Sequence, residues 1–145
     1  MTIDLTGQRV LVVGLGKTGM AVARLLAARG ARVVANDARG SDALASEAAM
    51  LRAEDVEVVL GSHEPALFTS VDRIVVSPGV PPLPALAAAE RAGVPIASEI
   101  EVASWFISGM LIGITGTNGK STVTTLVGEM CKRSGRPTFV GGNLG

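Results

Sequence analysis

Short apolar runs alternate with longer amphipathic stretches along most of the chain. Runs dominated by valine and other apolar residues predict buried strands over residues 9–14, 31–37, 56–61, 72–79 and 94–98. Apolar residues at helical spacing predict helices over residues 18–29, 41–53, 85–92 and 98–108. Because the strands alternate with helices and are almost uniformly apolar, they indicate a parallel sheet with helices on both faces.

The ends of these elements carry their own signals. Gly30 is placed to stop the first helix, and Ser41 could cap the second. Ser98 with Glu101 three residues later predicts a capping box at the start of the last helix. The proline-rich "SPGVPPLP" at 77–84 excludes helix and central strand, because proline lacks the N–H donor.

The pattern starts again after a break near residue 107. "MLIGIT" at 110–115 predicts a strand, residues 120–134 a helix, and "PTFV" at 137–140 another strand. We therefore expect an α/β protein: a Rossmann-like parallel-sheet domain over 1–107, followed by the truncated start of a P-loop ATPase-type α/β domain over 108–145. On this interpretation the chain is the N-terminal portion of a longer protein.

Composition narrows the classes of partner. The chain is 48% hydrophobic and 18% charged, with a formal net charge of zero and a pI near 6.6. These values exclude a disordered chain and argue against nucleic-acid or membrane binding through bulk charge. With a single cysteine, Cys131, no signal-peptide pattern and no long apolar run, we expect a cytoplasmic protein without a membrane span.

"GLGKTG" at 14–19 follows a predicted strand and opens a helix, which is the context of a dinucleotide-type phosphate loop. Gly14 would permit the tight turn, Gly16 the approach of a phosphate, and Gly19 close packing of the helix. Asp37, at the end of the second strand, is placed to accept hydrogen bonds from a ribose or a base. The pattern fits NAD, FAD or a UDP-sugar, and a plain strand–helix turn is the alternative.

"GTNGKS" at 116–121 also follows a predicted strand and opens a helix. In the P-loop pattern, backbone N–H groups cradle the phosphates, Lys120 reaches the β/γ oxygens and Ser121 binds Mg²⁺. The strict pattern needs glycine where Ile114 stands, so this loop is a variant. A dehydrogenase needs only the first loop and a simple ATPase only the second. An enzyme that couples ATP to a substrate carrying a diphosphate needs both.

"GLGKTG", "SPGVP", "GITGTNGKSTVTTLVGEM" and the closing "GGNLG" resemble the Mur ligase family over the whole 145 residues. "GTNGKS" alone would fit several Mur ligases and folylpolyglutamate synthetase. The glycine-rich N-terminus with "SPG" and "GGNLG" points to the member that adds D-glutamate. The resemblance implies the substrates UDP-N-acetylmuramoyl-L-alanine, D-glutamate and ATP, with Mg²⁺, and a monomer.

The resemblance also implies which residues bind. Substrate contacts would come from the first loop, the end of the second strand, the "SPG" turn and the chain end: Gly14, Leu15, Gly16, Lys17, Thr18, Gly19, Asp37, Ala38, Arg39, Ser77, Pro78, Gly79 and Asn143. ATP contacts would come from the second loop: Gly116, Thr117, Asn118, Gly119, Lys120, Ser121 and Thr122. Members often have a hydroxyl residue directly after the aspartate, and Ala38 cannot make that side-chain hydrogen bond.

The implied chemistry is acyl activation: ATP phosphorylates the alanine carboxylate, and the D-glutamate amine displaces the phosphate. Lys120 and Ser121 would be catalytic, and Ser121 the metal ligand. The family's further metal-binding residues and its D-glutamate-binding domain have no counterpart here, so we expect the chain alone not to catalyse ligation. Two alternatives stay open: an NAD(P)-binding oxidoreductase domain, supported by Asp37, and a non-catalytic nucleotide-sensing module. His63, the only histidine, is expected in a loop near a helix start, without a catalytic role.

Overall fold

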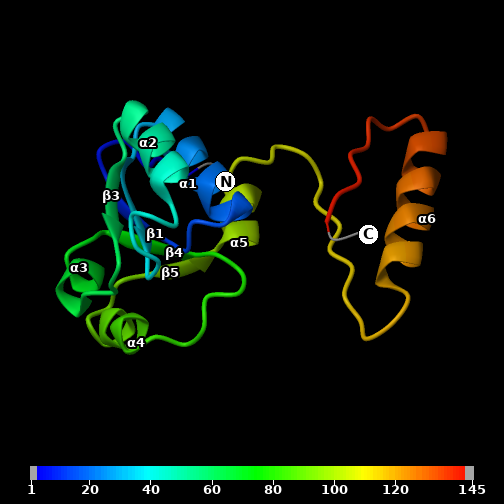
Figure 1. Ribbon diagram of the computed structural model, residues 1–145. Helices are drawn as coiled ribbons and strands as arrows, with labels where there is room; N and C mark the ends of the chain where they lie inside the picture. The colour runs from blue at the N-terminus through cyan, green and yellow to red at the C-terminus, as the bar shows by residue number, and fades with distance from the viewer. Residues whose placement is uncertain (1–2, 143–145) are drawn as a thin grey trace. The chain divides into compact units, whose positions relative to one another are not determined.

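The computed structural model describes residues 3–142 and divides the chain into two compact units, Met1–Ser108 and Gly109–Gly145. The first unit is built on five parallel strands (Figure 1). They are β1 (Arg9–Val13), β2 (Arg32–Asp37), β3 (Glu57–Leu60), β4 (Arg73–Val76) and β5 (Ile96–Ser98), in the spatial order β3-β2-β1-β4-β5. The predicted parallel sheet is confirmed.

Helices cover both faces of this sheet, as Figure 1 shows. They are α1 (Lys17–Ala28), α2 (Ala45–Ala53), α3 (Pro65–Thr69), α4 (Pro84–Arg91) and α5 (Glu99–Trp105). Alternate residues of β1 divide between the two faces, because successive strand side chains point to opposite sides. Val10 and Val12 pack in one core cluster with residues of α1, α2 and α5, whereas Leu11 and Val13 pack with α3 and α4. The all-apolar strands therefore reflect burial on both faces.

The strand order sets the place of a ligand site. From β1 the chain winds outward through β2 to β3, and then returns to β4 on the other side of β1. The loops after β1 and β4 therefore leave neighbouring strands in opposite directions. In open parallel sheets, ligands bind in the crevice at the carboxyl ends of the strands where the order reverses. Here that point lies between β1 and β4.

Local signals predicted some helix ends and missed others. The Ser98 side chain accepts a hydrogen bond from the Glu101 N–H at 3.2 Å, so the predicted cap of α5 is confirmed. The prediction for α2 was wrong: this helix begins at Ala45, and Ser41 lies in the preceding turn. The sequence indicated a helix start near His63 but gave that helix no bounds, and the structure places the short helix α3 there, with Pro65 in its first turn. Five residues are too few for a helical periodicity to be recognised.

The second unit contains one helix in its described part, α6 (Lys120–Arg133), as predicted. The strands predicted over 110–115 and 137–140 are wrong, because the structure has neither among the described residues. A strand needs a neighbour to pair its backbone groups, and an apolar sequence does not supply one. Met110, Leu111 and Phe139 are accordingly exposed. Within residues 3–142, no helix is long and apolar enough to cross a membrane.

Candidate nucleotide site

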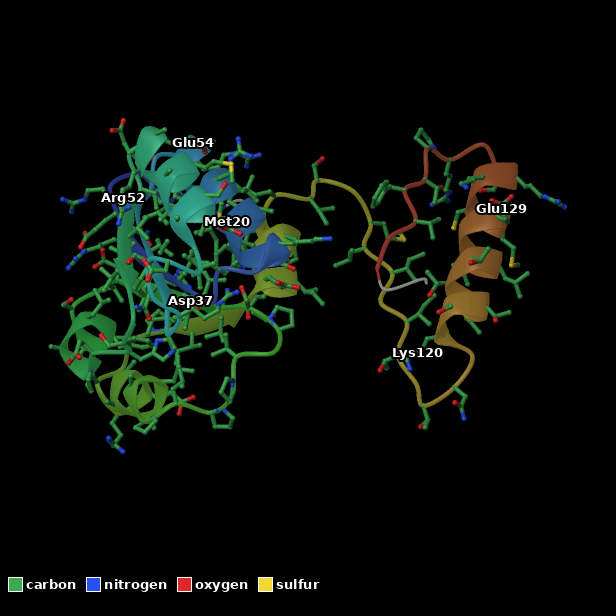
Figure 2. All side chains as sticks on the ribbon, viewed as in Figure 1. Met20, Asp37, Arg52, Glu54, Lys120 and Glu129 are labelled. Carbon is green, nitrogen blue, oxygen red and sulfur yellow. The ribbon has the colours of Figure 1, made fainter. Side chains whose placement is uncertain are left out.

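A cavity of about 330 Å³ lies across the carboxyl ends of β1 to β4, at the point where the strand order reverses. Its lining comes from the segments that follow these four strands: Gly14, Gly16, Thr18 and Gly19 after β1, Asp37, Ala38 and Arg39 after β2, His63 after β3, and Ser77, Pro78, Gly79, Val80 and Pro81 after β4. Its volume is within the range of about 300–1,000 Å³ that is typical of small-molecule sites. Figure 2 labels Asp37 in this part of the first unit.

Two glycines of the first loop are required by the geometry. Gly14 has a φ of 91°, and a side chain there would meet Val80 and Ser77. At Gly19 a Cβ atom would collide with the carbonyl of Gly14 and lie 2.8 Å from the Ser77 Oγ. That Oγ donates a 3.0 Å hydrogen bond to the same Gly14 carbonyl oxygen. The start of α1 therefore packs directly against the backbone of the turn after β1, and side chains of the turn after β4 close against both.

Gly16 differs from these two glycines. Its backbone is extended, with φ −76° and ψ −174°, and nothing lies within 4 Å of the place where a Cβ would stand. It precedes α1, whose first N–H groups have no carbonyl partner earlier in the helix. Such N–H groups and the helix dipole favour an anion. The open side of Gly16 on the cavity is therefore suited to the close approach of a phosphate.

Asp37 has partners that the sequence did not indicate. Its Oδ2 accepts hydrogen bonds from the Leu15 N–H at 2.7 Å and from Arg39 Nη2 at 2.7 Å. Its Oδ1 accepts from the Arg39 N–H at 2.9 Å and from Arg39 Nε at 3.0 Å. A carboxylate has about four lone-pair positions, and these four bonds use them. Contact between Asp37 and a ribose or base stays a prediction, and the geometry favours a role in holding Arg39 and the glycine loop.

This arrangement keeps Asp37 ionised. Burial alone would raise the pKa of its carboxyl group, but the hydrogen bonds from Arg39 and Leu15 outweigh it and lower the pKa to about 2. Arg39 is half exposed beside the buried aspartate. Since its fork is fixed on one side by the carboxylate, Arg39 offers a positioned cation at the mouth of the cavity.

Most of the expected substrate residues meet in the cavity, and a few do not. The Leu15 side chain is buried in the core and Lys17 is exposed outside the lining. Asn143 lies outside the described residues. Conversely, His63 lines the cavity although the sequence gave no reason to place it there. Its position follows from β3 ending beside β2, which is a long-range pairing rather than a local signal.

The second loop belongs to the second unit. Gly116 and Gly119 have φ of 151° and 76°, conformations that other residues rarely adopt. The Lys120 ammonium group donates to the carbonyl oxygens of Gly116 at 2.5 Å and Thr117 at 3.2 Å, so it lies over the loop. The remaining predicted ATP-binding residues are exposed around it: Asn118, Ser121 and Thr122. Within residues 3–142, no cluster of three or more acidic, histidine or cysteine side chains could hold a metal.

Fold and cavity together define a Rossmann-like α/β protein with a candidate nucleotide site at the carboxyl ends of its strands. A family model described as "Mur ligase MurD-like, N-terminal domain" matches residues 8–98, which include all five strands. The chain therefore belongs to the MurD-like Mur ligases. The resemblance stated from the sequence motifs is confirmed.

Individual relatives agree with this assignment. The chain is 52% identical over 144 residues to the UDP-N-acetylmuramoylalanine–D-glutamate ligase of Pelobacter propionicus. The aligned region covers 99% of this chain and 32% of the ligase. It is 52% identical over 147 residues to the ligase of the same name from Myxococcus xanthus, with 100% and 32% covered. A pseudomurein peptide ligase type C from Methanothermus fervidus has a similar structure, with a TM-score of 0.59, 25% identity, and 89% of this chain and 27% of that chain covered. The chain thus spans about a third of the length of its curated relatives.

Proposed function

We propose that this chain is the substrate-binding N-terminal part of an ATP-dependent ligase that joins D-glutamate to UDP-N-acetylmuramoyl-L-alanine in peptidoglycan synthesis. The observation that carries the proposal is the cavity at the strand-order reversal, with the glycine loop on one side and Arg39 on another. The two ligases described above supply the reaction. Identity near 50% over the whole chain supports the same substrate class.

In this proposal the first unit holds the nucleotide end of the substrate. The diphosphate lies against Gly16 and the first turn of α1, where N–H groups and an open backbone meet it. Arg39, fixed by Asp37, contacts the nucleoside or its phosphates. The Ser77–Gly79 turn closes the opposite wall. The first unit thereby fixes the nucleotide end of the substrate, and the alanine carboxylate at the other end is the group that is activated.

The second unit contributes the start of that ATP site. The chemistry of the donors in this loop fits a triphosphate: exposed backbone around glycines with positive φ, an ammonium group and a hydroxyl at the start of α6. ATP with Mg²⁺ supplies the phosphoryl group that activates the carboxylate for displacement by the D-glutamate amine. Lys120 would leave the loop carbonyls to pair with phosphate oxygens, and Ser121 would give Mg²⁺ one oxygen ligand. A cytoplasmic location and a monomeric state complete the proposal.

The oxidoreductase alternative has less support. A dinucleotide site needs the acidic residue after the second strand to accept hydrogen bonds from a ribose. The four acceptor positions of Asp37 are already used within the protein. A redox role would also leave the second phosphate loop without a purpose.

Calorimetric titration of the 145-residue chain tests the proposal. UDP-N-acetylmuramoyl-L-alanine should bind saturably, whereas NADH should give no heat above dilution. Saturable binding of NADH with no response to the UDP compound would overturn the assignment. A double variant, Arg39→Ala with Gly16→Val, should abolish the UDP signal and serves as the control for site-specific binding.

A further inference from the structure

His63 lines the cavity, and the proposed function gives its imidazole ring no task. It lies two residues past Gly61, where the chain leaves β3, and its side chain lines the cavity near Asp37 and Arg39. Its ring is held on two sides. Nδ1 lies 2.6 Å from the Asn36 Oδ1, and the ring meets Phe68 edge to face at a centroid distance of 5.9 Å. A ring fixed by a fully buried asparagine and a fully buried phenylalanine has little freedom to turn.

The orientation of Asn36 is determined by its other partners. Its Nδ2 donates to the carbonyl oxygens of Val59 at 2.9 Å and Ser62 at 2.8 Å. Carbonyl oxygens only accept, so the amide nitrogen must face them, and the amide oxygen is left to face His63. No alternative flip of the amide would satisfy both carbonyls.

This fixes the proton on the histidine. The amide oxygen is an acceptor, so the Nδ1 of His63 must carry a hydrogen and donate. In the neutral ring, Nε2 then has a free lone pair. Nε2 lies on the part of the ring that Asn36 does not engage, and His63 is only partly buried. The ring can therefore present a rigid hydrogen-bond acceptor to a ligand in the cavity.

An acceptor at this place complements what the cavity otherwise offers. The loop after β1 and Arg39 supply donors, which suit phosphate oxygens, and the Asp37 oxygens are used within the protein. With the diphosphate on the β1 loop, the ends of β2 and β3 face the nucleoside. A uridine has donors of its own: the imide N–H of the base and the ribose hydroxyls.

We propose that His63, held in its Nδ1-protonated form by Asn36, accepts a hydrogen bond from the nucleoside of the bound substrate and so contributes to base or sugar selection. The inference rests on the proposed function, because it requires a uridine nucleotide in the cavity. The donor is either the imide N–H or a ribose hydroxyl, and analogues separate the two.

The binding test uses UDP, CDP and 2′,3′-dideoxy-UDP with the wild-type chain, His63→Leu and His63→Gln. The leucine variant should bind UDP about five- to tenfold more weakly, the loss of one hydrogen bond. The glutamine variant should recover most of that loss, because its amide oxygen can stand near the place of Nε2. If the imide N–H is the donor, wild type and His63→Leu should bind CDP equally well, because CDP lacks that N–H. If a ribose hydroxyl is the donor, wild type and His63→Leu should instead bind 2′,3′-dideoxy-UDP equally well.

Some outcomes contradict only this inference. Equal losses for all three ligands, or no loss for UDP, would reduce His63 to a packing residue and leave the proposed function intact. A wild-type chain that binds no uridine nucleotide would instead overturn the proposed function. Circular dichroism and thermal unfolding of each variant separate loss of contact from loss of fold.

A spectroscopic test needs no variant. Because His63 is the only histidine, ¹⁵N-histidine labelling gives one pair of ring nitrogen signals. At pH 8 the long-range ¹H–¹⁵N spectrum should show a protonated Nδ1 and an unprotonated Nε2, and UDP should shift the Nε2 signal while pyrophosphate does not. A ring protonated on Nε2, or an Nε2 signal unmoved by saturating UDP, would overturn the inference.

Discussion

The Asp37 carboxylate accepts a 2.7 Å hydrogen bond from the backbone N–H of Leu15, which joins the end of β2 to the loop after β1. The same oxygen accepts from the Arg39 guanidinium, so one buried carboxylate fixes both the glycine loop and the cation beside it. Two parts of the cavity wall therefore depend on a single side chain.

Asp37→Asn should lower the free energy of unfolding by about 1–3 kcal/mol. The amide keeps one oxygen acceptor but loses the charge that pairs with Arg39, and its NH₂ group would face a donor. Urea unfolding measures the change. The matched control is Glu90→Gln, an exposed acid on α4, which should stay within about 0.5 kcal/mol of wild type. Equal effects of the two substitutions would show that the buried Asp37 carboxylate stabilises the fold no more than an exposed carboxylate does.

The contribution of Asp37 should depend on pH in a defined direction. Its pKa falls from the ordinary 3.8 to about 2 on folding, so the unfolded chain takes up the proton first as the solution is acidified. The stabilisation is complete above the unfolded pKa and is lost as the pH falls towards 2. The difference in unfolding free energy between wild type and Asp37→Asn should thus be constant from pH 7 to 5 and shrink below pH 4. A difference that grows on acidification would contradict the assignment.

Two glycines of one loop should respond differently to the same substitution. Gly19→Ala puts a methyl group against the Gly14 carbonyl and the Ser77 Oγ, and should cost about 1–3 kcal/mol of stability. Gly16→Ala puts it into open space at a non-strained backbone and should cost at most about 1 kcal/mol, the preference of an N-cap for glycine over alanine. Thermal unfolding measures both.

Ligand binding then separates the two roles further. If a phosphate approaches Gly16, the alanine there should weaken UDP binding tenfold or more although the fold is intact. Undiminished UDP affinity in Gly16→Ala would place the diphosphate elsewhere in the cavity. Gly19→Ala serves as the reference for a loss of binding that comes from a damaged loop.

Lys120→Ala should leave UDP binding unchanged and weaken the binding of ATP with Mg²⁺ about tenfold or more. Lys120 lies in the second unit, and loss of a charged donor to a phosphate costs about 1.5–3 kcal/mol. Lys132→Ala, in the last turn of the same helix and paired with Glu129, is the control and should have no effect on either ligand. Loss of UDP binding in Lys120→Ala would mean that the two sites are not independent.

The sequence predicted what local patterns can specify. Continuous apolar runs indicated a buried parallel sheet, and Ser98 with Glu101 marked the start of α5 correctly. It could not predict what depends on distant partners. The apolar segment at 110–115 is no strand because strand formation requires a paired neighbour. The partners of Asp37 and the position of His63 depend on how the strands pair, including β2 with β3, and no short sequence motif predicts such pairing.

The hydrogen bond between Ser77 and Gly14 joins residues 63 positions apart, and β2 and β3 lie between them in the chain. During synthesis, therefore, the glycine loop emerges from the ribosome well before the wall that completes it. Nascent chains halted with β4 still inside the exit tunnel should bind no UDP, and those in which the whole first unit, through α5, has emerged should bind it. The cavity is therefore complete only after the fourth strand has paired with the first, which sets an order of events that the sequence alone does not show.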